Sequence, residues 1–84
     1  MKSYFVLGKS RLFREYNVTR NFEKHVDAVE CIKNYATELG EKFNARIKRK
    51  NNGHLVEVIL KDSKITFELY KYVHEAPIGM YNRA

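Results

Sequence analysis

The 84-residue chain contains one cysteine, one proline, four glycines and no tryptophan. Because Cys31 is the only thiol, the chain cannot form an internal disulfide, which is typical of proteins in a reducing, cytoplasmic setting. Cys31 and the three histidines show no ligand-pair spacing, so we expect no metal site and no cofactor. Cys31 is interpreted as a small packing residue.

The sequence also lacks a long apolar run. No stretch approaches the roughly 20 apolar residues that a membrane-spanning helix needs, and the short run at residues 4–7 is followed by a glycine and charged residues. We therefore expect neither membrane association nor a secretory leader. Glycine-rich phosphate loops, nucleophile elbows and paired acid motifs are missing too, so no catalytic residue is predicted.

Two turn signals in the second half indicate a three-stranded meander over residues 43–73. Asn52-Gly53 separates two strand-like runs and is the strongest short signal for a hairpin with a type I′ turn. Asp62-Ser63 is the second candidate turn. Together they predict these facing pairs: Lys50 with Leu55, Arg49 with Val56, Lys48 with Glu57, Ile47 with Val58, Leu60 with Ile65, Val58 with Phe67, and Val56 with Leu69.

Alternation along the three strands sorts their side chains onto two faces. One face is apolar enough to be a core and carries Ala45, Ile47, Val56, Val58, Leu60, Ile65, Phe67 and Leu69. Arg49 is the exception on this face, where its stem can lie on apolar surface while its head reaches water. The other face is mixed and carries Arg46, Lys48, Lys50, Leu55, Glu57, Ile59, Thr66, Glu68, Tyr70 and Tyr72.

The first half predicts one helix, over residues 22–39, with Asn21 as N-cap and Gly40 as the C′ residue. Its apolar residues recur with a 3.6-residue period and are Phe22, Val26, Val29, Ile32, Ala36 and Leu39. On the same wheel His25 lies near the apolar face, which favours a buried, neutral histidine bonded to a core tyrosine. Residues 4–7 predict a strand, and residues 11–18 either a returning strand after a three-residue loop or an irregular basic arm.

These elements predict an α+β fold in which a single helix packs on one face of an antiparallel sheet of four to five strands. The expected order is strand, a possible second strand, helix, then the three strands of the meander. Residues 1–73 are expected to form one domain. Residues 74–84 are expected to form a C-terminal tail, because Pro77 and Gly79 interrupt regular structure there.

The net charge of +6 is unevenly distributed along the chain. Residues 9–20 hold four basic side chains against one acidic, and residues 42–50 hold five basic and no acidic ones. Residues 22–41, in contrast, hold two basic and five acidic side chains. The positive potential therefore belongs to the amino-terminal arm and the first strand of the meander, which is an argument about partners rather than fold.

The mixed sheet face and the basic arm are the candidate binding surface. Basic side chains hold phosphates and aromatic rings stack on unpaired bases, which is how many sheets bind RNA or single-stranded DNA. The candidate residues for nucleic-acid or partner binding are Arg11, Arg14, Arg46, Lys48, Lys50, Tyr70 and Tyr72. Glu57 and Glu68 on the same face weigh against this reading, and a basic edge strand can also serve only to prevent aggregation.

Three functions follow as hypotheses. The first is a small non-enzymatic module that binds nucleic acid. The second is a small regulator or inhibitor that binds a protein partner, with a composition rich in lysine, asparagine and tyrosine that suits a phage or mobile element. The third is a toxin-like ribonuclease that uses His54 with Arg49 or Lys50 nearby. His74 carries no signal, and the sequence predicts no oligomeric state.

Overall fold

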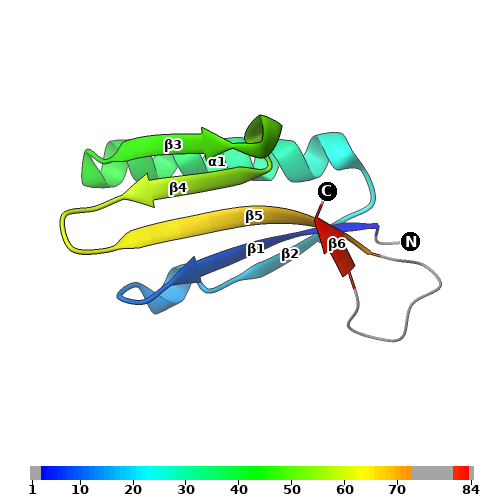
Figure 1. Ribbon diagram of the computed structural model, residues 1–84, viewed down its shortest axis with the longest axis horizontal. Coiled ribbons are helices and arrows are strands. Elements are labelled where there is room, and N and C mark those ends of the chain that lie inside the picture. The colour runs from blue at the N-terminus through cyan, green and yellow to red at the C-terminus, as the bar shows by residue number, and fades with distance from the viewer. Residues whose placement is uncertain (1–2, 73–80, 84) are drawn as a thin grey trace.

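The computed structural model describes residues 3–72 and the backbone of residues 81–83. Its strands and helix are β1 (Tyr4–Ser10), β2 (Thr19–Phe22), α1 (His25–Phe43), β3 (Arg46–Lys50), β4 (Leu55–Ile59), β5 (Lys64–Tyr72) and β6 (Tyr81–Arg83), with single 3₁₀ turns at η1 (Arg14–Tyr16) and η2 (Asn51–Gly53). The strands form an antiparallel sheet in the order β2-β1-β5-β4-β3, and β6 pairs with the end of β5. Figure 1 shows α1 running along one face of this sheet, behind β3 and β4.

The predicted α+β fold is confirmed: one helix packs on an antiparallel sheet whose last three long strands form the meander. Within the described ranges, no helix combines the length and the apolarity that a membrane crossing requires. The division into residues 1–73 and a tail at 74–84 stays a prediction, because residues 73–80 and 84 lie outside the described part of the chain. The backbone of β6, however, joins the sheet at Tyr70–Tyr72.

The first hairpin of the meander has the predicted turn and register. Asn52 and Gly53 both adopt positive φ, 56° and 85°, as a type I′ turn requires, and the His54 N–H donates to the Asn51 carbonyl oxygen at 3.0 Å. Lys50 faces Leu55, and the ladder continues to Arg46 opposite Ile59.

The predicted register of the second hairpin is wrong by two residues. Val58 faces Ile65, not Phe67, because the chain turns at Lys61-Asp62, where the Leu60 N–H donates to the Ser63 carbonyl oxygen at 2.9 Å. A shift of two residues preserves which face each side chain occupies. The predicted core face is therefore confirmed, with five of its members fully buried (Val56, Val58, Ile65, Phe67 and Leu69).

The helix begins three residues later and ends four residues later than predicted. Phe22 ends β2 opposite Tyr4, so Asn21 belongs to a strand and Lys24 is the N-cap residue. Asn44, not Gly40, adopts the left-handed conformation at the C-terminus, with φ 49° and ψ 46°. The buried stripe of α1 consists of Ala28, Ile32, Ala36 and Leu39.

Val26, which the periodic pattern placed on the buried face, is 66% exposed. Pairing between β1 and β2 overrides the periodic signal at the start of the helix, because it keeps residues 19–22 extended and excludes Phe22 from the helix. The core then forms where α1 lies on the sheet, and the ring of Tyr35 stacks on Phe67 with centroids 4.3 Å apart.

Residues 11–18 do not form a strand but an irregular segment that contains η1, as the second of the two predicted alternatives had it. The strand that pairs with β1 follows at Thr19–Phe22, which the sequence did not predict. Gly8 does not interrupt β1. A Cβ built on Gly8 would collide with the Tyr16 carbonyl oxygen and lie 2.9 Å from the Phe67 ring. The loop therefore packs directly against the backbone of β1 at this glycine.

Gly8→Ala is expected to destabilise the fold by about 1–3 kcal/mol, because the colliding atom is a backbone oxygen that cannot move aside cheaply. Gly40→Ala is the matched control: its Cβ would lie 3.4 Å from the Ile47 side chain and 4.0 Å from the Ala45 carbonyl oxygen, and alanine favours a helix interior. Urea unfolding of both variants measures the difference. Equal urea midpoints for the two variants would show that the loop does not pack against β1 at Gly8.

Candidate nucleic-acid interface

The sheet face that α1 leaves uncovered carries the basic side chains that the sequence placed there. Arg46, Lys48 and Lys50 alternate along β3, an edge strand, and all three are exposed. None of them lies beneath the helix. Ile47, between Arg46 and Lys48, packs against the core, and neighbouring side chains of a strand point to opposite faces. This surface, formed by β1, β5, β4 and β3, is called the outer face below.

Strand pairing brings cations of β1 and β5 to the same end of the outer face. One row across four strands runs Lys48, Glu57, Thr66 and Lys9, and the next row runs Arg46, Ile59 and Lys64. Because neighbouring strands are about 4.8 Å apart, the first row spans about 14 Å. With Arg11, which follows β1, these cations form the cation belt, defined as Lys9, Arg11, Arg46, Lys48 and Lys64.

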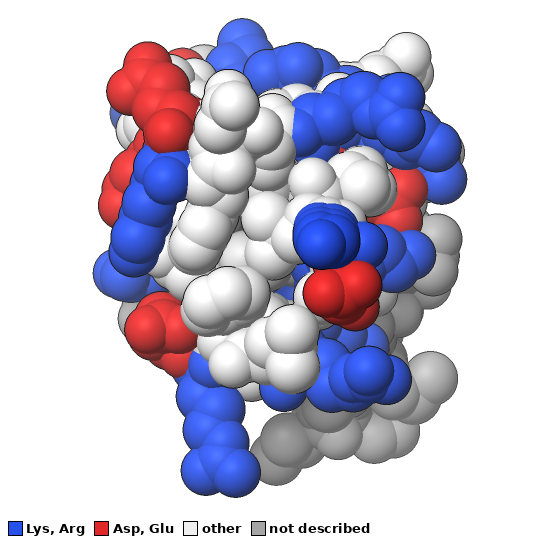
Figure 2. Space-filling model, turned by 90° about the vertical axis from the view of Figure 1, so that its left-hand side faces the viewer, with Lys and Arg blue, Asp and Glu red and all other residues white. Residues whose placement is uncertain are grey.

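An open groove of about 740 Å³ lies at this end of the outer face. The loop after β1 and the turn between β4 and β5 flank it, and its lining includes Lys9, Arg11, Ile59, Asp62, Lys64 and Thr66. Figure 2 views the molecule from this end and shows lysine and arginine side chains, with acidic side chains among them, around an uncharged central area. The groove is thus bordered by three members of the cation belt and one acid.

Hydrogen bonds fix the loop that carries Arg11. The Ser10 N–H donates to Asn17 Oδ1 at 2.9 Å, and Asn17 Nδ2 donates back to the Ser10 carbonyl oxygen at 2.9 Å. The Phe13 N–H donates to Ser10 Oγ at 2.9 Å. These bonds hold one wall of the groove in place. Arg14, the other predicted basic residue of this arm, lies in η1 and does not line the groove.

Glu57, the acid at the centre of the outer face, is neutralised by two lysines. Its carboxylate lies 2.8 Å from Lys64 Nζ and 3.0 Å from Lys50 Nζ, and its side chain is only 10% exposed. Hydrogen bonds from Lys64 and then from Lys50 lower the pKa of Glu57 to about 2. Glu57 therefore cancels one of the two lysine charges, and it positions Lys50 and Lys64.

Glu57→Gln is expected to make stability less sensitive to acid. An unfolded glutamate binds its proton near pH 4.5, whereas folded Glu57 stays ionised to about pH 2. The contribution of Glu57 is therefore complete above pH 4.5 and is lost as the pH falls toward 2. Melting temperatures from pH 6 to 2 should fall less steeply in the variant. If melting temperature fell equally steeply in the wild type and the variant, the pairing of Glu57 with the two lysines would be contradicted. Lys64→Met should reproduce part of the effect of Glu57→Gln.

The two tyrosines of the predicted site belong to an aromatic cluster that the sequence did not reveal. Tyr70 is 9% exposed, stacks on Phe5 with centroids 5.1 Å apart, and donates its hydroxyl to Glu68 at 2.7 Å. The Tyr72 ring lies 5.0 Å from Phe5, and its hydroxyl donates to Asn21 Oδ1 at 2.6 Å. The cluster exists because β1 pairs with β5, a long-range pairing that no local signal encodes.

The prediction that His25 is buried against a core tyrosine is wrong. Because α1 begins at His25, its side chain is exposed at the start of the helix, where its ring meets Tyr4 edge-on at 5.4 Å. Its Nε2 lies 3.0 Å from Nε2 of His54.

The ribonuclease hypothesis paired His54 with Arg49 or Lys50. Lys50 instead binds Glu57, and Arg49 lies on the opposite side of β3 from Lys48. Within residues 3–72, no three histidine, cysteine or acidic side chains gather as a metal site.

Cys31 packs against the core, as predicted, and is half-buried. Burial raises the pKa of its thiol, with a smaller opposing effect from Arg20, so Cys31 is poorly suited to nucleophilic chemistry near neutral pH. Comparison with known proteins assigns no identity to this arrangement, since neither a family model, nor a curated protein, nor a solved structure matches the chain.

Proposed function

We propose that this protein is a non-enzymatic module that binds RNA or single-stranded DNA through the cation belt. The observation that carries the proposal is that cations of β1, β5 and the loop after β1 border one open groove, while strand pairing places two cations of β3 on the same face. Cations held on paired strands present a fixed array to successive phosphates, and phosphate contacts supply most of the affinity in sequence-independent binding.

The charges on the other side of the molecule also favour the approach of a polyanion to the outer face. A second groove of about 590 Å³, between β2 and α1, has four acidic residues in its lining (Glu15, Asp27, Glu30 and Glu38) and one basic residue, Arg20. A polyanion is repelled from this side and attracted to the outer face. Such charge separation steers association even before contact.

Binding is proposed to depend on phosphates more than on bases. The ring of Tyr70 is buried and stacked on Phe5, and the ring of Tyr72 also packs against Phe5, so neither is a free-standing platform of the kind that base stacking uses. The expected consequence is little discrimination among sequences of equal length.

The test is a gel-shift or fluorescence titration of the full chain with labelled 15-nucleotide RNA and DNA at about 50 mM salt. We expect binding to both single strands, with similar affinity for mixed sequences. Absence of binding to either strand at this salt concentration would overturn the proposal.

The alternative is a protein partner that uses the same surface. The observation in its favour is that Leu7, Leu55 and Ile59 lie half-buried among the cations, which suits an acidic protein surface with apolar contacts. Pull-downs from native lysate with and without nuclease separate the two, since a protein partner survives nuclease treatment and one bridged by nucleic acid does not.

The ribonuclease hypothesis gains no support from the geometry. General acid and general base must act on different oxygens of a phosphodiester. His25 and His54 instead contact each other directly, with 3.0 Å between their Nε2 atoms.

A further inference from the structure

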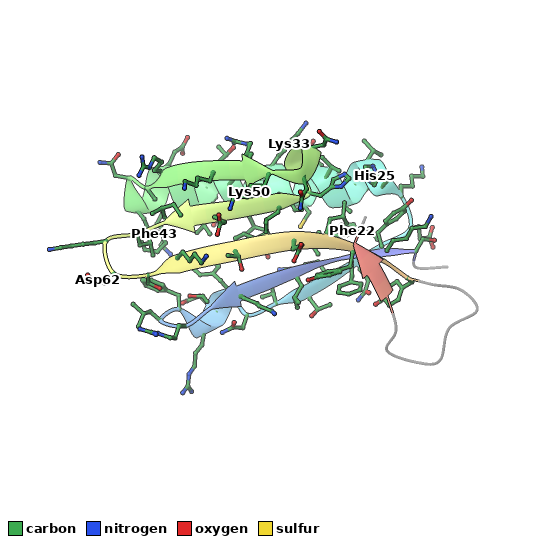
Figure 3. The ribbon with its side chains drawn as sticks, viewed as in Figure 1. Phe22, His25, Lys33, Phe43, Lys50 and Asp62 are labelled. Atoms are coloured by element: carbon green, nitrogen blue, oxygen red, sulfur yellow. The ribbon has the colours of Figure 1, made fainter. Side chains whose placement is uncertain are left out.

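Two histidines that are 29 positions apart in sequence meet at the end of the molecule opposite the groove. His25 is the first residue of α1, and His54 follows the η2 turn that joins β3 to β4. Their Nε2 atoms are 3.0 Å apart, and their rings are nearly perpendicular, at 79°, with centroids 4.9 Å apart. Figure 3 shows His25 at the start of α1, beside this end of the β3–β4 hairpin.

The folded backbone fixes the main-chain positions of both residues. The His54 N–H donates to the Asn51 carbonyl oxygen at 3.0 Å, and its carbonyl oxygen accepts the Leu69 N–H at 2.8 Å. His25 is anchored by the helix, and its ring is supported edge-on by Tyr4. The two imidazoles are therefore already in contact before any ligand binds, which lowers the cost of bringing them together.

We propose that His25 and His54 form a two-histidine site for a divalent transition metal, Cu²⁺ or Ni²⁺. A metal–nitrogen bond is about 2.0–2.1 Å, so two nitrogens are about 2.9 Å apart when they bind at 90° and about 3.4 Å apart at the tetrahedral angle. The observed 3.0 Å matches the 90° arrangement. Tetragonal geometry with nitrogen ligands is the preference of Cu²⁺ and Ni²⁺.

In the metal-free protein the same distance is that of a hydrogen bond between the two Nε2 atoms, whose donor depends on the tautomers of the rings. Metal binding requires a lone pair on both Nε2 atoms, so each bound ring carries its proton on Nδ1. Because His25 is solvent-exposed, water can complete the coordination shell. Two protein ligands make an exchangeable site rather than a permanent one.

The test is isothermal titration of the full chain, carrying no histidine tag, with NiCl₂ and CuCl₂ at pH 8 in a non-chelating buffer. We expect saturable binding of one ion, weakened at least about tenfold in His25→Ala and equally in His54→Ala, since even supporting groups around a metal contribute about 10–100-fold. The double variant measures the background of the remaining chain. Wild-type affinity equal to that background would overturn the proposal.

A second measurement does not depend on the variants. Paramagnetic Ni²⁺, added below one equivalent to the wild-type protein, should broaden the imidazole proton signals of His25 and His54 together and raise the melting temperature by linkage. Broadening of only one of the two rings, or broadening without any rise in melting temperature, would contradict a site shared between them.

Discussion

The double variant Arg46→Glu/Lys48→Glu is expected to bind single-stranded RNA about 30- to 150-fold more weakly than the wild type at 50 mM salt. Each reversal removes one attractive contact and adds a repulsive one, at roughly 1–1.5 kcal/mol per site near a solvated surface, and 1.4 kcal/mol corresponds to tenfold in affinity. Both side chains are exposed on edge strand β3, so folding is expected to be unaffected. A fluorescence titration measures the loss.

The control for that variant is Lys24→Glu/Lys33→Glu, which changes the net charge equally on the other side of the molecule. Both lysines are exposed, one at the N-cap of α1 and one within it. We expect this variant to keep its affinity within about threefold. Equal losses in the two double variants would mean that only total charge matters, and the cation belt would then not be a defined site.

Phe67→Ala is expected to destabilise the fold by about 3–5 kcal/mol, the range for truncating a buried aromatic residue. Phe67 is fully buried at the centre of β5, where it stacks on Tyr35 and lies against Gly8. Since domains of this kind are stable by only about 5–15 kcal/mol, the variant should be close to unfolding at 37 °C. Urea unfolding at 15 °C measures the loss.

Leu12→Ala provides the comparison for Phe67→Ala, because it also shortens a large apolar side chain but one that is 57% exposed. Its expected effect is within about 0.5 kcal/mol. If both substitutions cost the same, the core does not lie between α1 and β5.

Local signals in the sequence were sufficient to predict the three-stranded meander. The turn at Asn52-Gly53 has backbone angles that few other residues adopt, so it fixed both the hairpin and its register. Asp62-Ser63 carries no such restriction, and the turn formed one residue earlier. The exposure of Arg46 and Lys48 could be predicted because the register of the first hairpin was right, and the two-residue error in the second leaves every side chain on its own face.

Pairing between strands that are distant in the sequence could not be predicted from local patterns. The position of β1 beside β5 depends on pairs of residues 55 to 67 positions apart, and β2 pairs with β1 across 12 to 18 positions. These pairings moved the start of the helix, exposed Val26 and His25, and placed Phe5 against Tyr70. They also brought Lys9 into one row with Lys48, which no local pattern of the two segments could indicate.

The dependence of binding on salt tests the central claim most directly. If the five cations of the belt each contact a phosphate, log Kobs should fall with log salt concentration with a slope of about −3.5 on a single strand. In Arg46→Glu/Lys48→Glu the slope should flatten to about −2. A slope near zero in the wild type, or an unchanged slope in the variant, would show that the outer face does not hold a nucleic-acid backbone.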